Sequence, residues 1–175
     1  NSESTITYNG GAPLGALAGI LSALNNSSIM GSIGAGRAIE VRSPAGTFPT
    51  DVTLTISTYN ATVPLCSNAI NVALRLDVAP LIQPAKPIYL RASYGDAELL
   101  GIAPARLVLM RYEPISMTCV PLSTTFDTAA KTFTAVLNHF SLYQLAQAPV
   151  ATVAGTARVF PNPYRAASDG YVTID

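Results

Sequence analysis

Short runs of alternating residues separated by turns are the feature that most limits how this chain can fold. At residues 52–56, apolar side chains alternate with threonine, as expected for a strand buried on one face. Comparable runs occupy residues 38–41, 69–76, 88–92, 106–112, 132–137 and 140–145. Prolines, which cannot donate to a sheet ladder, stand between the runs, at Pro80, Pro84, Pro87, Pro104, Pro114 and Pro121. This pattern predicts an all-β fold, an antiparallel β-sandwich.

The first 36 residues have a different pattern. Residues 14–24 read Leu-Gly-Ala-Leu-Ala-Gly-Ile-Leu-Ser-Ala-Leu, which predicts a short apolar helix, and Gly31, Gly34 and Gly36 interrupt the residues after it. We interpret residues 1–36 as an irregular or short-helical N-terminal segment. It is either the tail of a preceding region or an arm that packs on the sandwich.

The remaining boundaries follow from composition. We place the sandwich at residues 37–148 and a linker of small residues at 149–155. Residues 156–175 are too few to bury a core, so we expect the first strand or strands of a truncated domain, or a strand that pairs elsewhere. The first residues, Asn-Ser-Glu-Ser, do not resemble a signal peptide, so we expect a mature or excised fragment.

Charge and hydropathy exclude several kinds of partner. Ten basic and ten acidic residues cancel in a chain with 11% charged residues. Such a chain offers no positive patch for nucleic acid or anionic lipid, so we expect neither as a partner. The longest apolar stretch, residues 13–24, is interrupted by glycine and is shorter than the roughly 20 residues of a membrane-spanning helix. Low charge with many Thr, Ser, Ala and Asn residues is typical of extracellular proteins, which predicts an extracellular or cell-surface location.

The chain has two cysteines, Cys66 and Cys119. Two cysteines without a cluster of histidines cannot form a tetrahedral zinc site. A disulfide is therefore the favoured interpretation in an oxidising compartment, and a pair of buried free thiols is the alternative.

Three stretches in order carry a family resemblance. Residues 39–49 read Ile-Glu-Val-Arg-Ser-Pro-Ala-Gly-Thr-Phe-Pro, residues 84–90 read Pro-Ala-Lys-Pro-Ile-Tyr-Leu, and residues 136–143 read Val-Leu-Asn-His-Phe-Ser-Leu-Tyr. On these stretches the segment from about residue 37 to residue 147 resembles the ZU5 family of β-sandwich modules, which is related to GAIN domains. The usual tryptophan is missing, because the chain has no Trp. The resemblance implies a sandwich in a bacterial secreted or surface protein.

A second, shorter resemblance lies near the C-terminus. Residues 157–164 read Ala-Arg-Val-Phe-Pro-Asn-Pro-Tyr. This stretch is similar to the opening of immunoglobulin-like C-terminal modules of bacterial secreted proteins. It implies that residues 156–175 begin such a module, which can serve sorting or attachment.

The tripeptide His139-Phe140-Ser141 is the candidate for chemistry. Some ZU5 modules and the GAIN domain cleave their own backbone at such a sequence, so the resemblance implies a break between Phe140 and Ser141. The Ser141 hydroxyl would attack the carbonyl carbon of Phe140, with His139 as general base. The C–N bond breaks as the C–O bond forms, the amine takes the proton, and water hydrolyses the ester. The reaction requires a strained turn. The alternative is that these residues simply begin the last strand.

Other candidate sites are weaker. Asp96 and Glu98 are close enough to pair as carboxylates, but Gly95-Asp96 is typical of a solvated turn. Asp77 stands among apolar residues and is expected to end a strand. The Gly31–Gly36 cluster lacks the lysine of a phosphate loop. We therefore expect no cofactor and no multiple-turnover activity, and at most a single-turnover autoproteolysis.

These observations predict a structural or adhesive module of a larger extracellular protein. Its partners would be other domains of the same polypeptide or neighbouring subunits. The alternative is a self-assembling surface or filament subunit, in which residues 1–36 or 157–175 complete the sheet edge of a neighbour.

Overall fold

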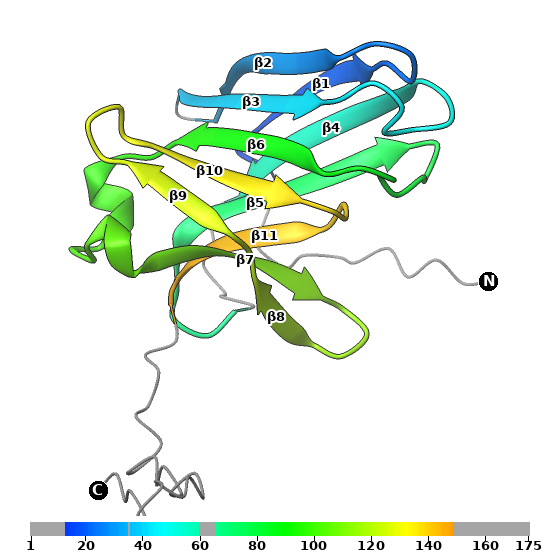
Figure 1. The fold of residues 1–175 in the computed structure, drawn as a ribbon. Helices are drawn as coiled ribbons and strands as arrows, with labels where there is room; N and C mark the ends of the chain where they lie inside the picture. The colour runs from blue at the N-terminus through cyan, green and yellow to red at the C-terminus, as the bar shows by residue number, and fades with distance from the viewer. Residues whose placement is uncertain (1–12, 35, 60–65, 149–175) are drawn as a thin grey trace, which may run out of the picture.

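The chain folds into two antiparallel sheets packed face to face, which confirms the predicted all-β sandwich (Figure 1). The computed structural model describes residues 13–34, 36–59 and 66–148. Sheet A has the strand order β1-β4-β5-β11-β7-β8, and sheet B has the order β2-β3-β6-β10-β9. The bounds are β1 Gly15–Leu21, β2 Ser27–Ile33, β3 Arg37–Ser43, β4 Val52–Tyr59, β5 Ala69–Ala79, β6 Ile88–Ser93, β7 Leu107–Glu113, β8 Thr118–Pro121, β9 Thr124–Asp127, β10 Thr132–Leu137 and β11 Leu142–Gln147.

The core lies between the sheets and is built from alternate residues of nearly every strand. In β4, Val52, Leu54 and Ile56 are buried, whereas the residues between them are more exposed. In sheet B, Leu90 and Phe133 have no exposed surface. All five side chains belong to one continuous apolar cluster, so in these strands the period-two pattern of the sequence follows the buried face.

The predicted helix at residues 14–24 is wrong, because this segment forms β1 and, after a turn, continues into β2. Strand β1 pairs with β4 in sheet A, and β2 pairs with β3 in sheet B, so these residues are part of both layers of the sandwich. The two strands fit together across the layers. A Cβ atom built on Gly19 would lie 2.8 Å from Cγ1 of Ile29, and one built on Gly31 would lie 2.9 Å from Cδ1 of Leu17. The glycines therefore provide room for apolar side chains of the opposite strand.

One of three acidic positions, Asp77, differs from expectation, whereas Asp96 and Glu98 do not form a carboxylate pair. Asp77 does not end a strand: it lies within β5, where its Oδ2 is 2.9 Å from Nε of Arg75. Asp96 and Glu98 lie in the short 3-10 helix Asp96–Leu99, and they pair with different cations. Asp96 contacts Lys131 at 2.5 Å, and Glu98 contacts Arg37. These carboxylates therefore hold neighbouring elements together and do not face each other as a catalytic pair. A second 3-10 turn, Pro104–Arg106, precedes β7.

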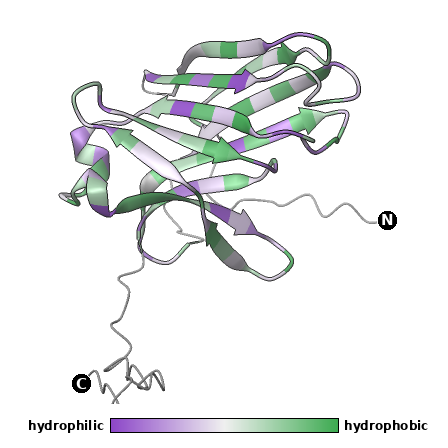
Figure 2. Cartoon of the chain, in the orientation of Figure 1, coloured by the Kyte–Doolittle hydropathy of each residue, from purple (hydrophilic) through white to green (hydrophobic). Residues whose placement is uncertain are grey.

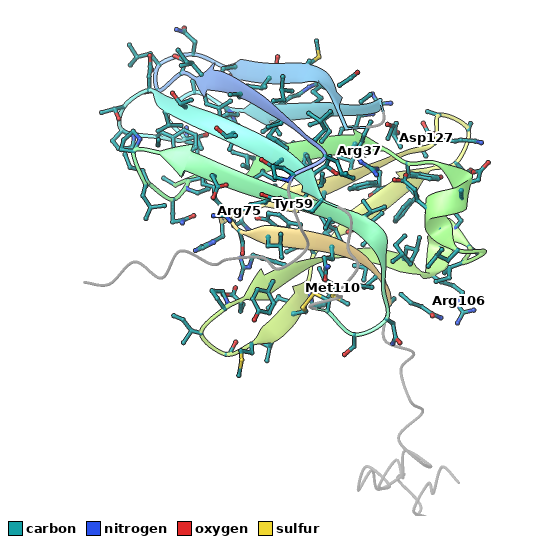
Figure 3. The ribbon with its side chains drawn as sticks, turned by 180° about the vertical axis from the view of Figure 1, so that it is seen from behind. Arg37, Tyr59, Arg75, Arg106, Met110 and Asp127 are labelled. Carbon is teal, nitrogen blue, oxygen red and sulfur yellow. A yellow bond between two sulfur atoms is a disulfide. The ribbon has the colours of Figure 1, made fainter. Side chains whose placement is uncertain are left out.

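Cys66 and Cys119 form the expected disulfide, with Cα atoms 5.7 Å apart. The bond joins the segment before β5 to β8, which is an edge strand of sheet A. Met110, labelled in Figure 3, and Ala146 are buried beside it in a small apolar cluster on the outer face of sheet A. Beneath this segment, Gln144 is fully buried, and its Oε1 accepts a hydrogen bond from the Cys66 amide at 2.9 Å.

The predicted linker at 149–155 and the predicted module at 156–175 lie outside the described residues and stay predictions. In the parts of the chain that the structure describes, no helix is long and apolar enough to cross a membrane.

Candidate functional site

His139, Phe140 and Ser141 lie where the chain crosses from one sheet to the other. Strand β10 of sheet B ends at Leu137, and β11 of sheet A begins at Leu142. The strand expected from residue 140 thus starts two residues later, because the chain is still crossing between the layers. We refer to residues 138–141 as the crossover segment.

Phe140 anchors the crossover segment in the core. Its side chain is buried, and its ring stacks on that of Phe48 with centroids 6.0 Å apart and planes at 15°. Its amide donates a hydrogen bond to Oε1 of Gln83 at 2.9 Å. The ring and the backbone of this residue are therefore fixed by two parts of the chain that are distant in sequence.

Ser141 is bonded on both sides to neighbouring strands. Its hydroxyl donates to the carbonyl oxygen of Tyr112 on β7 at 2.7 Å. Its own carbonyl accepts a hydrogen bond from the Leu76 amide on β5 at 3.0 Å. Since a hydroxyl has a single proton to donate, the Ser141 proton points to the backbone of β7 and not to His139.

Tyr143 links the start of β11 back to the crossover segment. Its ring is fully buried, and its hydroxyl donates a hydrogen bond to the carbonyl oxygen of His139. Burial raises the pKa of Tyr143 well above its ordinary value; nearby Arg111 opposes this shift, and Glu113 adds to it. Arg111 and Glu113 pair with each other at the end of β7.

His139 itself has one unusual atom. Its Nδ1 is buried and has no hydrogen-bond partner within the described residues. A buried nitrogen without a partner costs free energy. Nε of Arg111, on the neighbouring strand β7, shares this property. The structure thus brings the three residues of the tripeptide into one ordered turn, without a hydrogen bond from Ser141 to His139.

The raised pKa of Tyr143 predicts that stability falls in alkaline solution. The unfolded chain releases this proton near pH 10, whereas the folded chain retains it, so the stabilising effect is complete below about pH 10 and decreases as pH rises above it. We expect native protein to lose more unfolding free energy between about pH 9 and about pH 11 than Tyr143→Phe. Urea unfolding at both pH values measures this difference. Tyr89→Phe, which removes an exposed hydroxyl, should behave as native, and equal losses in native protein and Tyr143→Phe would contradict the assignment.

A second surface was not evident from the sequence. An open groove of about 1000 Å³, which we call the outer groove, lies on the solvent face of sheet B. It is lined in part by Met30, Glu40, Arg42, Tyr89 and Arg91. In the sequence, β3 and β6 show alternating polar residues, as any strand with one solvated face does. Only the register between the two strands shows that these polar residues lie side by side.

In the residues that the structure describes, no three His, Cys, Asp or Glu side chains gather into a group that could hold a metal ion. Comparison with known protein families and with curated proteins found no match for this chain.

Proposed function

We propose that this chain is a structural β-sandwich module of a larger extracellular protein, in which the crossover segment joins the two sheets. The observation that carries the proposal is the hydrogen bond from the Ser141 hydroxyl to the Tyr112 carbonyl. It gives the side chain that would act as nucleophile a role in joining the crossover segment to β7. The Cys66–Cys119 disulfide supports an oxidising compartment.

Self-cleavage between Phe140 and Ser141 requires the same residues to rearrange. The Ser141 hydroxyl would have to leave the Tyr112 carbonyl, turn toward the Phe140 carbonyl carbon and transfer its proton. The unpartnered Nδ1 of His139 is the group in the crossover segment that could accept that proton. Tyr143 donates a hydrogen bond to the His139 carbonyl, and Gln83 accepts one from the Phe140 amide. These two bonds hold the backbone of the crossover segment, which favours the architectural role over the reactive one.

Intact mass of the full chain under denaturing conditions separates the two roles. We expect one uncut species in native protein and in Ser141→Ala. The variant should lose about 1 kcal/mol of unfolding free energy, because the hydrogen bond to Tyr112 is lost. Ser123→Ala, at an exposed position, is the matched control and should unfold as native.

A C-terminal fragment beginning at Ser141, present in native protein and absent from Ser141→Ala, would contradict a purely architectural role. Denaturation is essential to this measurement. Because β11 is paired with both β5 and β7, a cut chain would remain associated in its folded state.

A self-assembling subunit is the second candidate. Strand β8 lies at an edge of sheet A. The turn before it carries two exposed apolar side chains, Ile115, which is fully exposed, and Met117, which is 77% exposed. An edge strand beside exposed apolar side chains favours pairing with another chain. Of the two segments expected to exchange, residues 1–36 include β1 and β2, which pair within the chain's own sheets, and residues 157–175 lie outside the described residues. Sedimentation of the full chain across a concentration series tests this candidate: growth in size with concentration supports it, and a monomer throughout contradicts it.

A further inference from the structure

The outer groove gathers polar and aromatic side chains from several strands through the register of sheet B. Met30 on β2 lies opposite Glu40 on β3, which lies opposite Arg91 on β6, which lies opposite Thr134 on β10. In Figure 2, hydrophilic bands lie beside apolar ones on β3 and β6. Because these positions all point away from the core, one row of the sheet presents four different side chains to a ligand.

The next row adds an aromatic ring and a second guanidinium. Ser28, Arg42 and Tyr89 lie opposite one another on β2, β3 and β6. The Tyr89 side chain is 45% exposed, and that of Met30 is 67% exposed. A half-exposed ring flanked by hydroxyl and charged groups offers a flat apolar surface together with hydrogen bonds at its rim.

The charged side chains of the outer groove sum to zero, and one of them, Arg91, lies outside the ion pair that the groove contains. Glu40 is paired with Arg42 at 2.5 Å. Arg91 forms no ion pair with any described residue, and its Nε donates a hydrogen bond to Oγ1 of Thr132 at 3.4 Å. Asp127 supplies the second carboxylate at the rim. Two cations and two anions give the groove no net charge, whereas Arg91 retains most of its five N–H donors for a ligand.

We propose that the outer groove binds a neutral polysaccharide chain. A sugar ring combines an apolar C–H face, which fits against the Tyr89 ring, with hydroxyl groups that accept from Arg91 and bond with Ser28 and Thr134. The absence of net charge disfavours a polyanion. A peptide would add to a strand edge in the plane of the sheet, but the groove lies on the face of sheet B, where side chains of β2, β3, β6, β10 and β9 line it. This ligand role goes beyond the architectural one, and neither mass nor sedimentation of the unliganded chain tests it.

Affinity electrophoresis of the full chain through gels containing hydroxyethyl cellulose, xylan, mannan or glycogen tests this proposal, together with sedimentation on insoluble chitin. We expect at least one polymer to retain the native protein. Tyr89→Thr, which keeps a strand-forming residue, and Arg91→Ala should each weaken retention by about threefold to tenfold, the range that corresponds to a lost stacking contact or hydrogen bond. Tyr89→Phe keeps the ring and should bind as native.

The matched control is Arg75→Ala. Arg75 lies on the outer face of sheet A, the sheet nearest the viewer in Figure 3, and removing it should leave retention unchanged. Retention by none of the five polymers would overturn the proposal. So would equal weakening by Arg75→Ala and Arg91→Ala, or a native dimer that Tyr89→Thr dissociates, because the occupant would then be a second copy of the chain.

Discussion

Replacing both Cys66 and Cys119 with alanine should lower the free energy of unfolding by about 4 kcal/mol. The disulfide closes a loop spanning a sequence separation of 53 residues, and the chain-entropy relation gives about this value for a loop of that length. The loss would be a large part of the roughly 5–15 kcal/mol that is typical of a whole domain. Urea unfolding of native protein and of the double variant, followed by fluorescence or circular dichroism, measures it.

Two further samples show whether the effect comes from the covalent bond. Native protein unfolded with a strong reductant present should match the double variant, because both have lost the same cross-link. Met110→Leu, a volume-conserving change in the cluster beside the disulfide, should cost less than about 1.5 kcal/mol. A double variant within about 1 kcal/mol of native would contradict the prediction, and would mean that the unfolded chain is already compact around residues 66–119.

Phe140→Ala should cost about 3–5 kcal/mol, because it removes a buried aromatic side chain and leaves a cavity against Phe48. This result would identify Phe140 as the residue that fixes the crossover segment in the core. Urea unfolding gives the change in free energy, and circular dichroism confirms that the strands still form. The effect should exceed that of Ser141→Ala severalfold, since a single hydrogen bond contributes only about 1 kcal/mol.

Ile115→Ala serves as the comparison for Phe140→Ala. The Ile115 side chain is fully exposed, so its removal should change the unfolding free energy by less than about 0.5 kcal/mol. Similar losses in the two variants would contradict the assignment of Phe140 to the core. They would also weaken the proposal that the crossover segment is chiefly a packing device.

The alternation of apolar and polar residues predicted, in sequence order, seven of the eleven strands that the described residues form. It succeeded where one face of a strand is buried, as in β4 and β10. It failed for β8, an edge strand with little burial, because such a strand needs no alternation of apolar and polar residues. It also failed for β1, where Leu17, Leu21 and Leu24 have the spacing of a helix face. The glycines that make room for the opposite strand removed the side chains that would have marked β1 and β2 as strands.

The candidate site was predictable only in its location. The pattern placed the tripeptide near the last strand, but the partner of the Ser141 hydroxyl, Tyr112, is 29 residues away. Nothing local in the sequence encodes such a contact, because it depends on which strands become neighbours. The outer groove was hidden for the same reason: Glu40 and Arg91 are each ordinary exposed residues until the register of β3 and β6 aligns them. The disulfide was easier, since two cysteines allow one pairing.

Strand β11 is the last strand of the described chain, yet it occupies an interior place in sheet A, with β5 on one side and β7 on the other. During synthesis on the ribosome, the β1-β4-β5 and β7-β8 parts of sheet A would therefore emerge before the strand that joins them. Until residues 142–147 arrive, each part exposes an open edge facing the gap. Sheet A can therefore close only after residues 142–147 have been synthesised. Before that point, its open edges are exposed to wrong pairing with neighbouring chains.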